Sequence, residues 1–280
     1  MRYTPNSSDD VVSGEGTATK TVIRRPWGWW AHLFLVHRDD LDPVIESGVR
    51  SSVDFCLHRA GLAPGARILD VGCGAGRHAL QMARRGMKVT GIDKADMLVR
   101  HARERAKNEG LDVVFRRADW HEAVFEDRFD ACFNLGISFG YEGIGKDCEL
   151  LRRMADLLLP GGILIIENDN PGSMLPGWIH DVVELPEFGR LFMRRRWDEA
   201  RSCFQGNFHL ETPAGEVIEL DRPSSSPYDE VIHVYRRDEM IAMIDEVGLR
   251  VSGLWGACIL PPEAYHRASQ RLVVEARKPC

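Results

Sequence analysis

Three glycines that follow an acidic residue form the clearest candidate binding site in this chain. Residues 67–71 are a short aliphatic run that contains Asp70, and Gly72, Gly74 and Gly76 follow it before a helix-forming stretch. This order predicts a strand, a tight turn and a helix N-terminus, an arrangement in which backbone approaches a nucleotide-like ligand closely. Glycine suits the loop because a Cβ at these positions would collide with the ligand. We therefore expect a ligand held largely by backbone.

The spacing of the glycines separates two kinds of ligand. The dinucleotide fingerprint G-x-G-x-x-G needs its third glycine at the position that Arg77 occupies, whereas Gly76 comes one position earlier. The pattern D-x-G-x-G-x-G resembles motif I of the class I S-adenosylmethionine (SAM) methyltransferases. This resemblance covers roughly residues 63–170 and implies SAM as methyl donor and S-adenosylhomocysteine as product. It leaves Asp70 two roles, contact with the methionine amino group or support of the glycine turn.

Further polar side chains follow the next three predicted strands. Asp93 lies 23 residues after the acid of the glycine loop, at a strand end where a carboxylate can hydrogen-bond ribose hydroxyls. Asp119 either accepts a hydrogen bond from the adenine amino group or caps its own loop, and Trp120 offers a flat apolar face to the ring. Asn134 and Ser138 follow the fourth strand and are expected beneath the methyl group. Together these residues predict a SAM site along one edge of a sheet.

Three segments show a closer likeness within that family. Residues 118–120, 129–139 and 161–170 resemble the glycine and sarcosine N-methyltransferase group. The chain departs from that pattern at Ile137, where the group has asparagine, and at Asp169, where it has the arginine that holds the amino-acid carboxylate. Two carboxylates facing each other in a closed site would be costly. The substrate is therefore expected to present an amine, ammonium or hydroxyl group rather than the carboxylate of glycine.

The chemistry of methyl transfer indicates which side chains to look for. An amine acceptor needs only to lose its ammonium proton, whereas a hydroxyl acceptor needs a base. We take Glu167, Asp169 and His233 as the catalytic candidates, although Asp169 also suits a turn cap and His233 a structural position. The residues expected to contact the substrate are Trp30, Tyr141, His180, Trp197 and Tyr235.

Alternating strand and helix signals run through the middle of the chain. The predicted strands are 67–71, 88–92, 112–116, 129–135 and 162–167, and amphipathic helical stretches lie between several of them. Such alternation is typical of a doubly wound, mainly parallel α/β sheet, which binds ligands at the carboxyl ends of its strands. With 250–255 and 272–276 added, and from the resemblance, we expect a Rossmann-like seven-stranded sheet with an antiparallel β excursion over the active site.

Changes in composition along the chain suggest five regions. We expect a mobile polar tail (1–25), an N-terminal helical cover (26–62), a SAM-binding core (63–170), a substrate-binding excursion (171–235) and the C-terminal part of the core (236–280). The cover is rich in tryptophan and aliphatic residues, which suits either core packing or a roof over the site. The excursion contains two stretches with strand character, 204–210 and 231–235.

Overall composition excludes several classes of protein. The 280 residues carry a net charge of −6, which argues against binding to nucleic acid, whose affinity comes from a basic face. Seven cysteines form no C-x-x-C pair and no zinc-like spacing, so we expect free thiols and no metal site. No apolar run has membrane-spanning length, and no signal-peptide pattern is present. We expect a cytoplasmic protein that binds a small-molecule substrate and not a membrane, with a homo-oligomer left open.

The resulting prediction is a SAM-dependent methyltransferase of a small molecule, most simply at an amine nitrogen. O- or C-methylation of a small natural-product-type substrate is the alternative, followed by a SAM-binding protein without catalysis. A nicotinamide-dependent dehydrogenase is disfavoured by Arg77 and by the pair Asp119 and Trp120. Methylation of protein or nucleic acid is disfavoured by the acidic balance and by the absence of an N-P-P-Y-type motif at 134–137.

Overall fold

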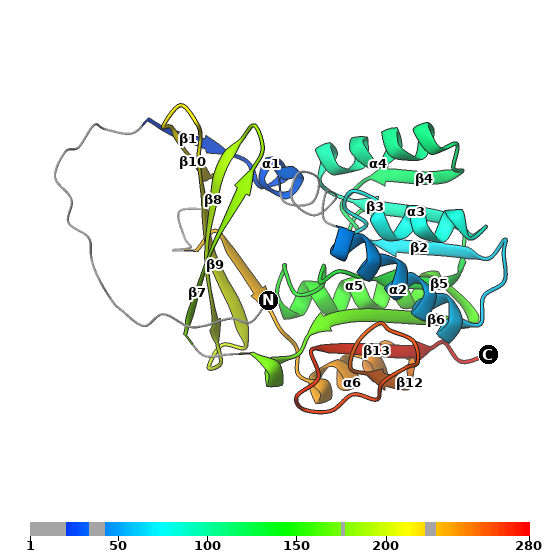
Figure 1. Ribbon diagram of the computed structural model, residues 1–280. Helices are drawn as coiled ribbons and strands as arrows, with labels where there is room; N and C mark the ends of the chain where they lie inside the picture. The colour runs from blue at the N-terminus through cyan, green and yellow to red at the C-terminus, as the bar shows by residue number, and fades with distance from the viewer. Residues whose placement is uncertain (1–20, 34–42, 175–176, 222–227) are drawn as a thin grey trace.

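Two β-sheets stand side by side in the computed structural model, and a short helix lies between them (Figure 1). The structure describes residues 21–33, 43–174, 177–221 and 228–280. The remaining parts of the predicted tail, cover and excursion lie outside the described residues. None of the described helices is both long and apolar enough to cross a membrane.

The larger sheet is the expected seven-stranded Rossmann-like sheet. Its strand order is β12-β13-β6-β5-β2-β3-β4, and every strand except β13 points the same way, because β13 pairs antiparallel with both neighbours. The predicted doubly wound α/β fold is confirmed. The strands are β2 (Arg67–Val71), β3 (Lys88–Asp93), β4 (Val113–Arg117), β5 (Phe129–Asn134), β6 (Leu158–Asp169), β12 (Arg250–Trp255) and β13 (Arg271–Arg277).

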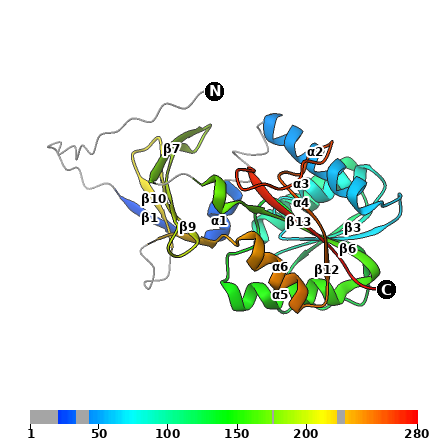
Figure 2. The same cartoon turned by 90° about the horizontal axis from the view of Figure 1, so that it is seen from below.

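Helices cover both faces of this sheet (Figure 2). Along β6, Ile163 and Ile165 pack into the core beneath α2, α3 and α4, whereas Leu164 and Ile166 pack into the core beneath α5 and α6. Such alternation follows from the two-residue period of a strand, and it buries β6 on both faces. The helices are α2 (Pro43–Ala60), α3 (Arg77–Arg84), α4 (Asp96–Glu109), α5 (Ile144–Leu157) and α6 (Arg237–Glu246).

The second sheet contains the expected antiparallel excursion. Its order is β1-β10-β9-β8-β7, and β11 pairs with another part of β9. The sequence predicted only the strands that became β9 and β11; β7, β8 and β10 were missed. The strands are β1 (Val22–Arg25), β7 (Trp178–Leu185), β8 (Gly189–Asp198), β9 (Cys203–Glu211), β10 (Val217–Leu220) and β11 (Glu230–His233).

The predicted N-terminal tail of residues 1–25 extends too far along the chain. Residues 22–25 form β1, which pairs in parallel with β10 from Val22 opposite Val217 to Arg25 opposite Leu220. The polar composition of this stretch hid the strand because most of β1 is exposed at the edge of the sheet. The pairing partner lies almost 200 residues away in sequence, so no local pattern could indicate it.

The N-terminal helical cover has both of the roles that the sequence left open. Helix α2 belongs to the core, since Val53, Phe55 and Cys56 are fully buried against the large sheet. Helix α1 (Trp27–His32) instead connects the two sheets. Its Trp30 packs into the core of the second sheet, while Ala31 packs against the glycine loop and α4. Helix α1 thereby helps to hold the second sheet against the carboxyl edge of the first.

Candidate active site

A cavity of about 520 Å³ lies where the carboxyl ends of β2, β3 and β5 face the second sheet. We call it the glycine-loop cavity. Its volume is within the range of about 300–1,000 Å³ that is common for small-molecule sites. Its lining comes from the first sheet and its loops, from α1 and α4, and from the inner face of the second sheet. The members used below are Trp30, Gly72, Gly74, Asp93, Lys94, Trp120, Ser138, Tyr141, Met193, Arg195, Phe208, Leu220, Asp229 and Glu230.

The three glycines of the loop serve different purposes. Gly72 and Gly74 line the cavity with φ angles of 72° and 53°, and a Cβ at Gly72 would lie 2.6 Å from Ser138 Oγ. Gly76 does not line the cavity. Its missing side chain makes room for Phe115, whose Cζ would lie 2.7 Å from a Cβ there, and its φ of 79° starts α3. The prediction that Gly76 contacts the ligand is therefore replaced by a packing role.

Asp93 lies at the cavity and also supports the loop above it. Its carboxylate accepts hydrogen bonds from the backbone N–H groups of Gly74 at 2.9 Å and Ala95 at 2.8 Å. Burial raises the pKa of Asp93, and these hydrogen bonds act in the opposite direction. Each carboxylate oxygen has more than one lone pair, so Asp93 keeps acceptor capacity toward the cavity.

Asp70 lies beneath the glycine loop and not at the cavity. It is only 2% exposed, and no hydrogen-bond partner of its Oδ2 lies among the described residues. Burial, followed by the nearby charge of Asp93, raises the pKa of Asp70 to about 7, while a hydrogen bond from the backbone of Ala79 lowers it. Of the two roles considered from sequence, the geometry favours support of the turn.

Asp119 and Trp120, which follow β4, have different roles. Asp119 Oδ1 accepts a hydrogen bond from the His121 backbone N–H at 2.9 Å, and Asp119 lies outside the cavity lining, which fits the loop-capping interpretation. Trp120 lines the cavity. The ammonium nitrogen of Lys94 lies 5.8 Å from the centre of its ring, and Trp120 Nε1 has no hydrogen-bond partner in the described part of the chain.

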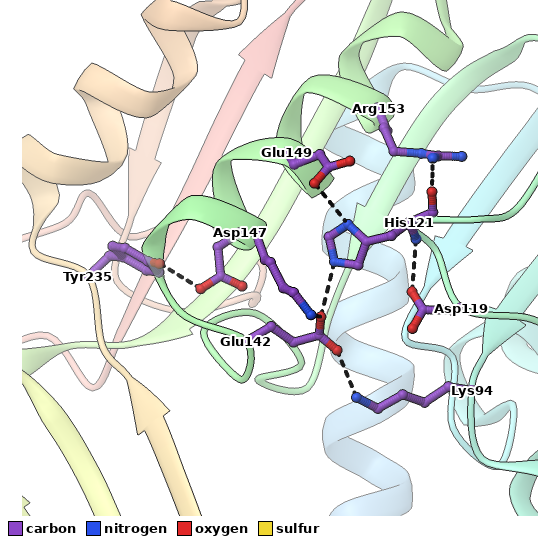
Figure 3. Close-up of polar contacts among 9 residues, drawn as sticks. Lys94, Asp119, His121, Glu142, Asp147, Glu149, Arg153 and Tyr235 are labelled. Atoms are coloured by element: carbon purple, nitrogen blue, oxygen red, sulfur yellow. Dashed lines mark hydrogen bonds and ion pairs between the residues drawn. The ribbon is translucent and has the colours of Figure 1, made fainter.

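A polar network that the sequence did not indicate holds Lys94 and His121, the residue after Trp120, in place (Figure 3). Glu142 pairs with Lys94 Nζ at 2.8 Å and with His121 Nε2 at 3.1 Å. Arg153 on α5 donates hydrogen bonds to the carbonyl oxygens of His121 and Ala123. The network joins the end of β3, the loop after β4, the loop before α5 and α5 itself, and the first three of these segments line the cavity through Lys94, Trp120 and Tyr141.

Asn134 and Ser138 lie close to the loop, although only Ser138 reaches the cavity. Asn134 is fully buried, and its Nδ2 donates a hydrogen bond to the Val71 carbonyl at 2.9 Å. It therefore ties β5 to the start of the glycine loop. Ser138 lines the cavity next to Gly72.

None of the three expected catalytic residues lines the glycine-loop cavity. Glu167 accepts a hydrogen bond from the Gly136 backbone N–H at 3.0 Å, which places it behind the loop that follows β5. Asp169 forms an ion pair with Arg271, which lies directly opposite on β13. His233 packs its ring against another aromatic ring, and its Nε2 has no partner among the described residues.

The pairing of Asp169 corrects one step of the sequence interpretation. An arginine was thought to be replaced by an uncompensated anion, but Arg271 supplies the cation from the neighbouring strand. The pKa of Asp169 is raised by burial, while Arg271 and Arg195 act against that rise. Local sequence could not show this pair, because its members meet only through the pairing of β6 with β13.

The residues predicted to contact the substrate lie in different parts of the structure. Trp30 and Tyr141 line the glycine-loop cavity, whereas exposed His180 on β7 does not. Trp197 lines a different cavity, described below. Tyr235 was wrongly placed: it is fully buried in the core, and its hydroxyl donates to Asp147 Oδ2 at 2.6 Å.

The strongest feature that the sequence missed is a charged cluster opposite the glycine loop. Tyr141, Arg195 and Glu230 all line the cavity, and the Tyr141 hydroxyl hydrogen-bonds Glu230. Burial raises the pKa of Glu230; the Tyr141 hydrogen bond and Arg195 lower it, and Asp229 raises it. A strand starting one residue earlier than predicted would have pointed to Glu230, since it is the first residue of β11.

The geometry fits the donor that the glycine loop implied. The cavity-lining backbone of Gly72 and Gly74, the carboxylate of Asp93 and the indole of Trp120, whose N–H has no partner among the described residues, suit a ligand with an aliphatic chain, a diol and a heteroaromatic ring. Gly72, Gly74, Asp93, Trp120 and Ser138 are the residues that would hold SAM. Among the described residues, no group of three or more His, Cys, Asp or Glu side chains is arranged to bind a metal ion.

Comparisons with known proteins agree with this donor. Residues 68–162 match a family described as a methyltransferase domain. Ubiquinone biosynthesis O-methyltransferases from Aeromonas salmonicida and Ruegeria pomeroyi are 33% and 37% identical over 176 and 177 residues, which is 61% and 62% of this chain and 68% and 69% of theirs. The chain belongs to the class I SAM-dependent methyltransferases.

Solved structures resemble the whole fold at lower identity. The CcbJ methyltransferase from Streptomyces caelestis has a TM-score of 0.71 and 19% identity, over 89% of this chain and 96% of that one. The sugar N-methyltransferase KedS8 from Streptoalloteichus has a TM-score of 0.62 and 20% identity, over 99% and 100%. These structures support the fold, whereas the family match and the curated relatives support SAM as the methyl donor. The predicted likeness to the glycine and sarcosine N-methyltransferases receives no specific support.

Proposed function

We propose that this methyltransferase acts on the nitrogen of a small amine. The observation that carries the proposal is the Glu230 carboxylate, which faces the glycine-loop cavity from the second sheet and is hydrogen-bonded by Tyr141. A carboxylate at this place attracts a cationic ammonium group and can accept its proton. A substrate carboxylate would instead meet the acidic side chains of Glu230 and Asp229, while two cations of the lining are already paired, Arg195 with Asp181 at 2.9 Å and Lys94 with Glu142 at 2.8 Å.

The role of Glu230 follows from the state of an amine in water. Most aliphatic amines are protonated at neutral pH and have no lone pair for attack until a proton leaves. SAM supplies an electrophilic methyl group on a sulfonium, so the acceptor needs only its free lone pair. Glu230 is a stronger base than an ordinary glutamate because burial raises its pKa. Tyr141 holds the carboxylate in place by donating its hydroxyl hydrogen.

The surrounding side chains limit access of water to the same space. Trp30, Met193, Phe208 and Leu220 contribute apolar surface to the cavity wall, and all four belong to α1 or the second sheet. Most of the rate enhancement in methyl transfer can come from holding two reactants together in a dry site. In this proposal Glu167 and Asp169 act indirectly, by fixing the loop at Gly136 and by pairing with Arg271.

Oxygen methylation is the second candidate. Its support is the identity of at least 33% to the two O-methyltransferases, whereas the sugar N-methyltransferase shares only the fold at 20%. A hydroxyl acceptor would also need Glu230, as the base that removes its proton. The two candidates therefore share the same residue and differ in the product.

A panel of small amines and phenols, incubated with methyl-labelled SAM, tests the proposal. We expect labelled N-methyl product and a kcat reduced at least about a hundredfold in Glu230→Gln, the lower range for loss of a general base. The Kd for SAM should stay unchanged, because the Asp93 side of the cavity is intact. Glu263→Gln, an exposed change in the loop before β13, is the matched control.

The pH dependence provides an independent check. Glu230 acts as a base only when ionised, so the wild-type rate should fall as the pH drops through a pKa above the ordinary 4.5 of glutamate. Wild-type activity in Glu230→Gln would refute the role of this residue. Labelled methyl groups on oxygen alone would select the second candidate.

A further inference from the structure

A second cavity, of about 630 Å³, lies beside the first and has a different character. We call it the arginine cavity. It is formed by the turn after β6, the end of β8, the start of α6 and the loop between β12 and β13. Its charged lining consists of Arg236, Arg237, His266 and Arg267 together with Glu199 and Asp238.

Two of its arginines form no ion pair with an acid among the described residues. Arg237 Nε donates to Asp238 Oδ1 at 2.8 Å, so these two charges offset each other. No salt bridge joins Arg236 or Arg267 to an acidic side chain in the part of the chain that the structure describes. Glu199 is the one remaining acid of the lining. The cavity therefore has an excess of positive charge in a chain whose net charge is −6.

The wall of this cavity is held by buried contacts. Asn170 is 1% exposed, and its Nδ2 donates to the carbonyl oxygens of Arg267 at 3.0 Å and Ser269 at 2.6 Å. Its Oδ1 accepts from Gly172 N at 3.1 Å and from the Tyr265 hydroxyl at 3.0 Å. These bonds join the end of β6 to the loop that carries Arg267, so the backbone position of that arginine is defined before a ligand binds.

One strand of the second sheet, β8, contributes side chains to both cavities. Met193 and Arg195 line the glycine-loop cavity, and Trp197, the next residue on the same face of β8, lines the arginine cavity. Side chains two residues apart on a strand are separated by about 7 Å. Asp169, whose charge interacts with Arg195, is followed directly by Asn170 in the wall of the arginine cavity. The two cavities are therefore neighbours along β8 and the end of β6.

We propose that the arginine cavity binds a phosphate or carboxylate group of the methyl acceptor, at the end remote from the reacting nitrogen. This proposal rests on the proposed function, since it assigns the other end of the same acceptor to Glu230. Arg236 and Arg267 would donate charge-assisted hydrogen bonds to the anion, and Trp197 offers an aromatic face to the part between. The acceptor is then an elongated molecule, cationic at one end and anionic at the other.

Isothermal titration with inorganic pyrophosphate and, separately, with succinate tests the anion site without methyl transfer. At 150 mM salt, where long-range attraction is screened, we expect one of the two probes to bind with a Kd on the order of 1 mM. The double variant Arg236→Gln/Arg267→Gln should weaken that binding at least tenfold. Arg250→Gln, an exposed arginine on β12, is the matched control and should change nothing.

Results of two kinds would overturn the proposal. One is the absence of binding by either probe at 20 mM, or an equal affinity in the double variant and the wild type. The other is displacement of SAM by the probe, which would place the anion in the glycine-loop cavity. Both arginines are exposed, so the variants are expected to keep the wild-type Tm.

This experiment separates the two proposals. The double variant keeps Glu230, and Glu230→Gln keeps the arginine cavity. A failure of amine methylation therefore leaves the anion titration valid, and a failure of the titration leaves the role of Glu230 untouched.

Discussion

Replacing Asp70 with asparagine is expected to remove a large pH dependence from the stability of this protein. Burial raises the pKa of Asp70 from 3.8 to about 7, a shift of roughly three units. Since one unit corresponds to about 1.4 kcal/mol, ionising this carboxyl in the folded chain costs about 4 kcal/mol. Total stabilities are about 5–15 kcal/mol, so an effect of this size is readily measurable.

The sign of the effect follows from where the proton is held. Between about pH 4 and pH 7 the folded chain keeps the proton on Asp70 and the unfolded chain does not, so raising the pH lowers the free energy of unfolding. Asparagine keeps an oxygen for the Ala79 backbone but cannot ionise. The stability of Asp70→Asn relative to wild type should therefore rise by about 1.4 kcal/mol per pH unit across this window.

Urea unfolding of both proteins at intervals from pH 4 to pH 8 measures this difference. Asp112→Asn, which removes a charge from an exposed position before β4, reports the effect of altered net charge alone. A difference between Asp70→Asn and wild type that stays constant within about 0.5 kcal/mol would refute the reasoning, because one ionisation shifted by three units must appear in it.

Three further substitutions test the roles assigned above. Gly76→Ala should lower the free energy of unfolding by about 1–3 kcal/mol in urea titration, because its Cβ would lie 2.7 Å from Phe115 Cζ. Asp93→Asn should weaken SAM binding at least tenfold by calorimetry, since a carboxylate at the cavity becomes an amide. Tyr235→Phe should lower stability by about 1–2 kcal/mol, because buried Asp147 loses the hydrogen bond from the Tyr235 hydroxyl and keeps the one from the backbone of Gly140, while kcat and the Kd for SAM stay unchanged.

A specific result would contradict each of these three predictions. Gly61→Ala is the control for Gly76, since it has a positive φ of 65° but open space around a Cβ; an equal loss in both variants would show that no clash exists. Unchanged SAM affinity in Asp93→Asn would remove that residue from the donor site. A large fall in kcat in Tyr235→Phe without a loss of stability would restore its earlier assignment as a substrate contact.

Local sequence was sufficient for the donor half of the site. Asp93 and the cavity-lining glycines, Gly72 and Gly74, lie within one strand–turn–helix unit and the next strand end, where parallel pairing brings successive strand ends to one edge. The order and spacing of these residues therefore determine their relative positions before the rest of the chain is considered. The doubly wound core was predictable because strands and helices alternate between residues 67 and 167, whereas the count of seven strands was expected from the resemblance to the class I methyltransferases.

The acceptor half depends on contacts between distant segments. Glu230 faces Tyr141 only because β11 pairs with β9 and the second sheet stands over the first. Asp169 seemed uncompensated in sequence, but Arg271 lies opposite it through the pairing of β6 with β13. The inward or outward direction of a side chain on a strand depends on register, and register is set by the partner strand. The identity of the donor could thus be predicted from the sequence, whereas the residues that face the acceptor emerge only once the two sheets are packed together.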